Sequence, residues 1–174
     1  LEHQPQMPDV PSPAALEPRE KILLRNAFRV DPAKRDEFTR PRPFEIREVA
    51  PRDSLEPENT SDINHMWIRM EAAKGAGPQL QHVLMAYASD FGLLGSALRP
   101  HGLTWHKPEA MTASLDHAMW YHRPFNVNEW LLFSMHTPNA SGARCLGQGS
   151  IFDRQGNLVA TVVQEGLARP NQSD

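Results

Sequence analysis

One apolar segment, residues 82–100, restricts the possible folds of this chain more than any other feature. Its large apolar side chains recur every three or four residues, the spacing of a helix face that packs against a core: Leu84, Tyr87, Phe91, Leu94 and Leu98. Pro78 is well placed as the first helical residue, and Pro100 and Gly102 mark the end. The sequence therefore predicts one long helix turned toward a core.

A single carboxylate, Asp90, borders this apolar face. Burying an ionised carboxylate is costly unless hydrogen-bond donors meet it, so a helix that carries one there often has a function for it. Gly92 and Gly95 each cost roughly 1 kcal/mol relative to Ala within a helix, which indicates a close approach to the backbone. From the residues alone, a functional Asp90 and a solvent-facing Asp90 are about equally good interpretations.

The rest of the chain predicts two short helices, at residues 17–28 and 32–38, and a sheet. Six segments have strand patterns, some alternating apolar and polar residues: 44–49, 65–70, 111–122, 129–135, 143–152 and 158–164. Residues 153–157 include Gly156 and predict a hairpin connection between the last two strands. One long helix and several antiparallel strands predict an α+β fold with the sheet wrapped around the helix.

Length and composition describe one globular domain, because 174 residues with a hydrophobic fraction of 40% suffice for a single core. The net charge of −3 offers no electrostatic argument for binding nucleic acid or an anionic membrane. The single cysteine, Cys145, cannot form an internal disulfide and fits a reducing compartment. No apolar run approaches the roughly 20 residues that a membrane span needs.

The ends of the chain carry three further expectations. No signal peptide or peroxisomal C-terminal signal is recognised, so a cytoplasmic location is expected, with a peroxisomal one as the alternative. Five of the sixteen prolines fall within residues 1–20, which predicts an extended linker. Because the first residue is Leu1 and not Met, we expect the chain to be a piece of a longer protein.

Taken singly, the other polar residues of interest are ordinary. Ser114 is interpreted as a tolerated small residue in a sheet, and Gln164 as an edge amide that faces solvent. Four histidines lie within a short span but lack metal-ligand spacing, and His117 and His122 point to opposite sides of a strand. We therefore predict no metal site among these histidines: His101, His106, His117 and His122.

Three long motifs carry a resemblance to a known family. YASDFGLLGSALRPHG (87–102), SLDHAMWYHRPFNVNEWLL (114–132) and VVQEGLAR (162–169) resemble the C-terminal half of type II acyl-CoA thioesterases, a family that includes bacterial cytosolic and eukaryotic peroxisomal enzymes. The opening HQPQMPDVPSP (3–13) resembles the stretch in which members of this family leave their first half. The resemblance covers essentially the whole chain.

Members of that family are double hotdogs, each hotdog being a long helix wrapped by an antiparallel sheet. The resemblance implies that this chain holds the second hotdog, over residues 40–170. Residues 1–39 would then be the end of the first half with a proline-rich linker and a short helix, and residues 171–174 a tail. The first hotdog, on the order of 100 residues by ordinary domain size, has no counterpart in the printed sequence.

By residue-for-residue match, the family's catalytic Asp, Thr or Ser, and Gln fall on Asp90, Ser114 and Gln164. The resemblance implies hydrolysis of an acyl-CoA thioester to a fatty acid and CoA, with no metal, no covalent intermediate and no cofactor, CoA being part of the substrate. Asp90 would take a proton from the attacking water, which Ser114 and Gln164 would hold. An Asp flanked by Phe91 and Leu94 should be a better base, because desolvation raises its pKa.

Several alternatives remain open. Ser114 as a nucleophile is a second mechanism, disfavoured because no histidine is placed as its base. A second function is a non-catalytic half-domain that needs the N-terminal hotdog to bind and turn over acyl-CoA. An exposed edge strand predicts association with an N-terminal hotdog half or self-association as a homo-oligomer. Arg99, Arg123 and Arg144 are candidates for contacts with the CoA phosphates, and the sequence does not choose among them.

Overall fold

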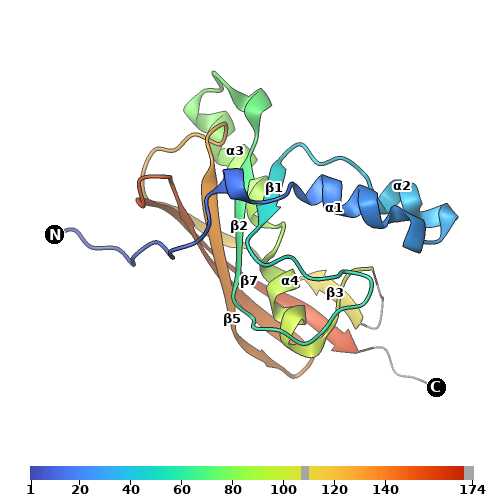
Figure 1. Ribbon diagram of the computed structural model, residues 1–174. Coiled ribbons are helices and arrows are strands. Elements are labelled where there is room, and N and C mark those ends of the chain that lie inside the picture. The colour runs from blue at the N-terminus through green and yellow to red at the C-terminus, as the bar shows by residue number, and fades with distance from the viewer. Residues whose placement is uncertain (107–109, 171–174) are drawn as a thin grey trace.

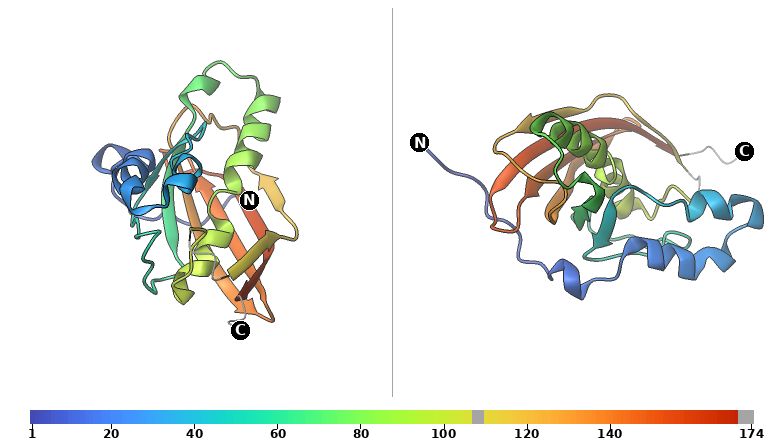
Figure 2. Two further views of the ribbon diagram at one scale, coloured as in Figure 1. Left: turned by 90° about the vertical axis from the view of Figure 1, so that its right-hand side faces the viewer. Right: turned by 90° about the horizontal axis from the view of Figure 1, so that it is seen from above.

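The computed structural model describes residues 1–106 and 110–170. Its described residues form one antiparallel sheet, which curls around the central helices (Figures 1 and 2). The strand order is β1-β2-β5-β6-β7-β3, and β4 also pairs with β7. The strands are β1 (Glu45–Glu48), β2 (Asn64–Arg69), β3 (Ala110–Ser114), β4 (Ala118–Tyr121), β5 (Leu131–Ser141), β6 (Arg144–Phe152) and β7 (Leu158–Pro170). The α+β class predicted from the sequence is confirmed.

The last two strands form the predicted hairpin. Asp153 lies at its turn, where its Oδ1 accepts hydrogen bonds from the backbone N–H groups of Gln155 and Asn157 at 2.9 and 2.8 Å. Gly156 has φ +84°, a conformation that glycine adopts without steric cost. The main difference from the prediction is length, because β5 and β7 each run six residues farther toward the C-terminus than expected (to Ser141 and Pro170).

The single strand predicted at 111–122 is wrong, since the structure divides it into β3 and β4. Both pieces pair with β7, in the registers Ser114↔Gly166 and Ala118↔Val163. Between them the Asp116 side chain accepts a hydrogen bond from the backbone N–H of Glu165 at 2.7 Å. A carboxylate thus takes the place of a backbone partner, so the ladder is interrupted and the chain bends.

The long helix predicted from residue 78 onward is also divided, into α3 (Pro78–Ser89), α4 (Leu93–Leu98) and the 3₁₀ turn η5 (Arg99–His101). Gly92 lies at the break, and a Cβ there would stand 2.8 Å from the Met135 sulfur of β5. The close approach predicted at Gly92 is therefore made by the sheet, whereas a Cβ at Gly95 would meet only the Trp105 indole nitrogen, at 3.6 Å. Among the described residues, none of the helices is both long enough and apolar enough to cross a bilayer.

The break changes which residues face the core. Leu94 and Leu98 are buried as predicted, but Tyr87 is 46% exposed. The buried face of α3 includes two polar residues, Gln81 and Ser89. Gln81 is hydrogen-bonded there, because its Oε1 accepts from the backbone N–H of Val127 at 2.8 Å. The expected continuous apolar stripe fails because α4 no longer continues the helical repeat of α3.

The first part of the N-terminal segment, from Met7 to Leu16, packs on the face of the sheet that carries Trp67, opposite the central helices. It is extended as its prolines predicted, with short helical pieces farther along: η1 (Pro13–Ala15), α1 (Arg19–Asn26), η2 (Ala27–Arg29), η3 (Pro32–Lys34) and α2 (Arg35–Phe38). The indole N–H of Trp67 donates to the carbonyl of Pro11 at 2.9 Å. Met7, Val10 and Leu16 pack against a small apolar cluster around Trp67.

The predicted domain boundaries are not tested by the fold. The division between residues 39 and 40 stays a prediction, and the tail predicted at 171–174 lies outside the described residues.

Candidate active site

Gln164 lies in the middle of β7 with no exposed surface, so its interpretation as a solvent-facing edge amide is wrong. On one side, Gln164 is in register with Gly147 of β6. On the other side, it lies opposite the bend that separates β3 from β4. The interrupted strand therefore leaves room for a side-chain contact beside a buried amide.

The amide nitrogen of Gln164 binds both other predicted site residues. It donates one hydrogen bond to Asp90 Oδ1 at 2.8 Å and another to Ser114 Oγ at 2.8 Å. A glutamine amide has two N–H donors, so these two contacts use its full donor capacity. The fold thus brings together three residues that are 24, 50 and 74 positions apart along the chain.

Asp90 and Ser114 are both exposed in this chain, in contrast to the buried Gln164. The burial of Asp90 expected from its apolar neighbours is wrong, because α3 ends at Ser89 and Asp90 is its C-cap residue. A carboxylate at that position is open to water while one of its oxygens is held by the amide. The arrangement is a fixed amide with an accessible carboxylate and an accessible hydroxyl.

Two glycines of the sheet allow α4 to lie close enough to bring Asp90 to Gln164. A Cβ at Gly147 would stand 3.1 Å from the carbonyl oxygen of Leu93, and one at Gly166 would overlap the side chain of Leu94. Sequence reasoning missed these residues as contributors to the site. The available signal was glycine inside a strand pattern, which marks close backbone approach.

A second contact joins the end of α3 to the bend between β3 and β4. Ser89 is fully buried, and its Oγ lies 2.8 Å from His117 Nε2. The same hydroxyl donates to the carbonyl of Ala86 at 2.8 Å. This pair, also missed from the sequence, anchors the bend that follows Ser114 to the residue that precedes Asp90.

The histidines and the cysteine considered in the sequence analysis lie in other surroundings. His122 Nε2 lies 2.8 Å from Thr161 Oγ1, so it does not share a partner with His117. Burial raises the pKa of the Cys145 thiol, which keeps it in the protonated form. Across residues 1–106 and 110–170, the side chains of His, Cys, Asp and Glu form no group of three that could hold a metal ion.

A wide cavity of about 870 Å³ extends from Asp90 toward α1 and α2. Tyr87, Phe91 and Phe44 line it beside the carboxylate, and their rings contact one another with centroids 4.9–6.5 Å apart. Ser114 is not part of this lining. Asp90 therefore faces a space whose nearest walls are aromatic.

A curled antiparallel sheet around a central helix is the hotdog fold. A solved hot dog protein from Alicyclobacillus acidocaldarius has the same fold, with a TM-score of 0.68 at 16% identity, covering 99% of this chain and 58% of that one. A solved acyl-CoA thioesterase II, TesB2 of Mycobacterium marinum, gives a TM-score of 0.73 at 36% identity, covering 99% of this chain and 59% of that one. The predicted hotdog fold is confirmed.

This chain belongs to the acyl-CoA thioesterase family, whose sequence profile matches residues 33–167. It is 33% identical to acyl-CoA thioesterase 2 of Haemophilus influenzae over 169 residues, which cover 97% of this chain and 59% of that protein. It is 32% identical to human acyl-coenzyme A thioesterase 8, over 97% of this chain and 54% of that protein. The chain thus spans somewhat more than half the length of these relatives.

Proposed function

We propose that this chain carries a site for hydrolysis of acyl-CoA thioesters, with Asp90, Ser114 and Gln164 as its catalytic residues. One observation carries the proposal: a single buried amide binds both an exposed carboxylate and an exposed hydroxyl, each at 2.8 Å. Membership of the acyl-CoA thioesterase family supports the substrate class. We also propose that the protein acts in the cytoplasm.

In this mechanism Asp90 is the general base. Its Oδ1 is held by Gln164, and its other oxygen is left to accept a proton from a water molecule. The oxygen of that water forms a bond to the thioester carbonyl carbon, and collapse of the tetrahedral intermediate breaks the carbon–sulfur bond. The CoA thiolate takes up the proton, and since thiols have a pKa near ~8.5, it leaves without strong acid assistance.

Ser114 and Gln164 supply position in this proposal. Gln164 donates to Ser114 Oγ, so the hydroxyl proton of Ser114 is free to point toward the attacking water. Fixing a nucleophile in place replaces a bimolecular encounter and lowers the entropy cost of attack. Ser114 as a nucleophile is disfavoured, because the nearby His117 contacts Ser89 instead.

The test is steady-state hydrolysis of palmitoyl-CoA by this chain, followed by release of free thiol. Asp90→Asn keeps the shape of the side chain but removes its basicity, so the rate should fall about 10²–10⁴-fold. Asp36→Asn is the matched control, because Asp36 is exposed on α2, far along the chain from the site. A rate that survives Asp90→Asn would contradict the mechanism.

A second candidate function, a half-domain that needs a partner hotdog for turnover, is favoured by the apolar surface beside the site. Leu80 and Val83 of α3 are 50% and 63% exposed, and Trp120 of β4 is 52% exposed. The Tyr121 hydroxyl donates to the carbonyl of His82 at 2.8 Å, so β4 and α3 lie together on this side. Exposed apolar patches of this kind mark interaction surfaces.

We propose that another hotdog, either an N-terminal half or a second copy of this chain, covers that surface. Sedimentation velocity should show the chain as a dimer or larger, and Val83→Glu should shift it toward monomer. A folded wild-type chain that is monomeric and hydrolyses palmitoyl-CoA would exclude the half-domain interpretation. A folded chain that is inactive until a first-half hotdog is added would establish it.

A further inference from the structure

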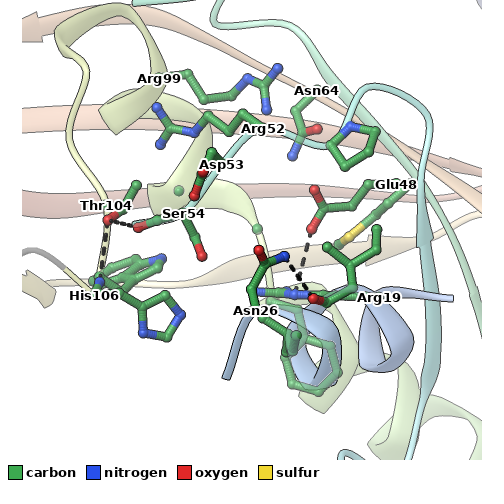
Figure 3. A pocket seen from close by; sticks show the side chains of 18 of the residues that line it. Arg19, Asn26, Glu48, Arg52, Asp53, Ser54, Asn64, Arg99, Thr104 and His106 are labelled. Carbon is green, nitrogen blue, oxygen red and sulfur yellow. Dashed lines mark hydrogen bonds and ion pairs between the residues drawn. The ribbon is translucent and has the colours of Figure 1, made fainter. Parts of the chain in front are cut away.

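A small polar cavity of about 120 Å³ adjoins the cavity beside Asp90 and shares Phe91, Trp105 and His106 with it, but Asp90 is not part of its lining. Figure 3 shows its polar side chains. The cavity is enclosed by α1, the segment that follows β1, and the end of α4. A single buried water needs a cavity volume of roughly 10–15 Å³, so this cavity has room for a small polyatomic ion. Its polar lining consists of Arg19, Asn26, Glu48, Arg52, Asp53, Ser54, Asn64, Arg99, Thr104 and His106.

Two arginines form one wall of this cavity. Arg99 is only 6% exposed, and its Nε donates to the carbonyl of Ser61 at 3.0 Å. Arg52 donates through Nη2 to the carbonyl of Leu103, while its Nη1 is buried with no partner among the described residues. Both guanidinium groups therefore hold loops in place with one nitrogen and keep other N–H donors unused. Figure 3 shows both side chains above Glu48 and Arg19.

The charge of Arg99 acts on Arg52. Burial lowers the pKa of Arg99, and burial together with the positive charge of Arg99 lowers the pKa of Arg52, while the Glu48 carboxylate opposes both shifts only in part. Burial together with the charge of Arg99 also lowers the pKa of the neighbouring His65. Placing two like charges close together in a low-dielectric region is unfavourable unless negative charge offsets them.

The carboxylates near this wall are bound to other arginines. Glu48 pairs with Arg19 at 3.5 Å, and Asp53 pairs with Arg29 at 2.7 Å. Within residues 1–106 and 110–170, no carboxylate oxygen lies within 4.0 Å of a nitrogen of Arg52 or Arg99. Arg29 is shared between Asp53 and Glu56, whose carboxylate lies 3.1 Å from Arg29 Nη2. Four arginines (Arg19, Arg29, Arg52 and Arg99) therefore face three carboxylates (Glu48, Asp53 and Glu56), which leaves an excess of one positive charge.

Two uncharged side chains, Asn64 and His106, also line the cavity. The Oδ1 atom of Asn64 is buried without a partner among the described residues. An amide can turn to present its NH₂ group instead, which would suit an anion better than the oxygen does. Burial also lowers the pKa of His106, so that ring is neutral at pH 7 and brings no further charge.

We propose that this cavity is a binding site for a phosphate group, held between Arg52 and Arg99 with Asn64 as a neutral donor. Guanidinium groups match the geometry of phosphate oxygens and form charge-assisted hydrogen bonds with them. A phosphate offsets the excess positive charge and has enough oxygens to accept hydrogen bonds from both guanidinium groups at once. The ligand is either free phosphate or the terminal phosphate of a larger molecule such as CoA.

The first experiment is thermal unfolding of this chain in inorganic phosphate and in sodium chloride at equal ionic strength. Phosphate should raise the Tm by at least ~3 °C at saturation, because it binds the folded state alone. Arg99→Gln and Arg52→Gln should each weaken the phosphate response roughly tenfold or more. Arg154→Gln is the matched control, because Arg154 is exposed in the hairpin turn, and it should respond like the wild type.

The wild-type titration decides the proposal even if a variant fails to fold. Equal Tm values in phosphate and chloride would overturn it, as would an unchanged phosphate response in a folded Arg99→Gln chain. As an independent measurement, NMR titration of the His65 ring should show its pKa rising when phosphate binds, because the anion offsets Arg99. An unchanged His65 titration in saturating phosphate would place the anion elsewhere and overturn the assignment.

Competition then separates the two sources of phosphate. Free CoA that displaces phosphate, when dephospho-CoA does not, would assign the site to the 3′-phosphate of CoA. Phosphate bound with the same affinity in the presence of CoA would assign it to a free phosphate ion. Both results rest on direct binding, so they stand whether or not the chain hydrolyses palmitoyl-CoA.

Discussion

Two groups of polar residues lie near Phe91, which lines both the cavity beside Asp90 and the arginine cavity, and they distribute charge and burial in different ways. In the group Asp90, Ser114 and Gln164, the neutral amide is buried and the charged carboxylate is exposed. In the arginine cavity, the buried Arg99 lies beside the half-buried Arg52. The Gln164 amide has both N–H groups bonded and only its Oε1 buried without a partner among the described residues, and this neutral group costs less than neighbouring like charges that lack an ion-pair partner.

The difference shows what each group needs. In the first, both N–H groups of the buried amide are bonded within this chain, while the carboxylate and the hydroxyl are open to solvent, and a partner on the exposed apolar surface of α3 and β4 would cover them. In the second, two neighbouring arginines have no carboxylate oxygen within 4.0 Å among the described residues. The following predictions test this contrast, beginning with the largest expected effect.

Replacing the buried amide should separate activity from stability. Gln164→Leu fills the same site with an apolar side chain, so it removes both hydrogen bonds while leaving no cavity. Hydrolysis of palmitoyl-CoA should fall about 100-fold or more, while the free energy of unfolding changes by less than about 1 kcal/mol. Enzyme kinetics and urea unfolding of the same preparation measure the two effects.

Gln155→Leu is the control for this substitution, because Gln155 is exposed in the hairpin turn. Combining Gln164→Leu with Asp90→Asn should add little to the loss caused by Asp90→Asn alone, since the two residues act as a unit. Fully additive losses would show that the amide and the carboxylate act independently, and the contrast with the arginine cavity would lose its basis.

Two glycine substitutions test the close approach of α4 to the sheet. Gly166→Ala places a methyl group against Leu94, so it should lower the free energy of unfolding by about 1–3 kcal/mol. Gly95→Ala, whose nearest neighbour would be the Trp105 indole nitrogen at 3.6 Å, should raise it by about 0.5–1 kcal/mol through helix propensity. Chemical unfolding measures both, and equal effects of the two substitutions would contradict the packing described.

The smallest expected effect concerns His65 near the arginine cavity. Burial and Arg99 lower its pKa in the folded chain, so the unfolded chain binds the proton more readily. Its neutral form therefore contributes stability above pH 6.5, and the free energy of unfolding falls as the pH drops below this value. The loss should be about 1 kcal/mol or less and should level off below the folded-state pKa.

Urea unfolding at pH 7.5 and pH 5.5 measures this loss. His65→Gln should reduce the difference between the two pH values, while His101→Gln, at an exposed position, should leave it unchanged. Saturating phosphate should also reduce the difference in the wild type, because it offsets Arg99. The opposite slope, with stability rising toward acid through His65, would contradict the burial of a positive charge beside it.

Most of the fold was predictable because it depends on local patterns. Alternation predicted the strands, Gly156 predicted the hairpin turn, and the motifs around Asp90, Ser114 and Gln164 predicted three candidate residues. Two predictions failed for one shared reason: a local pattern does not report where a chain bends. The chain bends at Gly92, between α3 and α4, and at Asp116, between β3 and β4, and each bend involves contacts with a distant strand.

The sequence by itself determined the α+β class through the spacing of its apolar residues, and it indicated the family and the candidate catalytic residues through the resemblance of three long motifs to type II acyl-CoA thioesterases. Only the tertiary structure decided that Gln164 is buried, that Asp90 is exposed at the end of α3, and that Arg52 and Arg99 share a cavity. Burial and charge pairing depend on contacts between segments far apart in the chain. Such contacts exist only once the sheet has closed around the helices, so no local pattern encodes them.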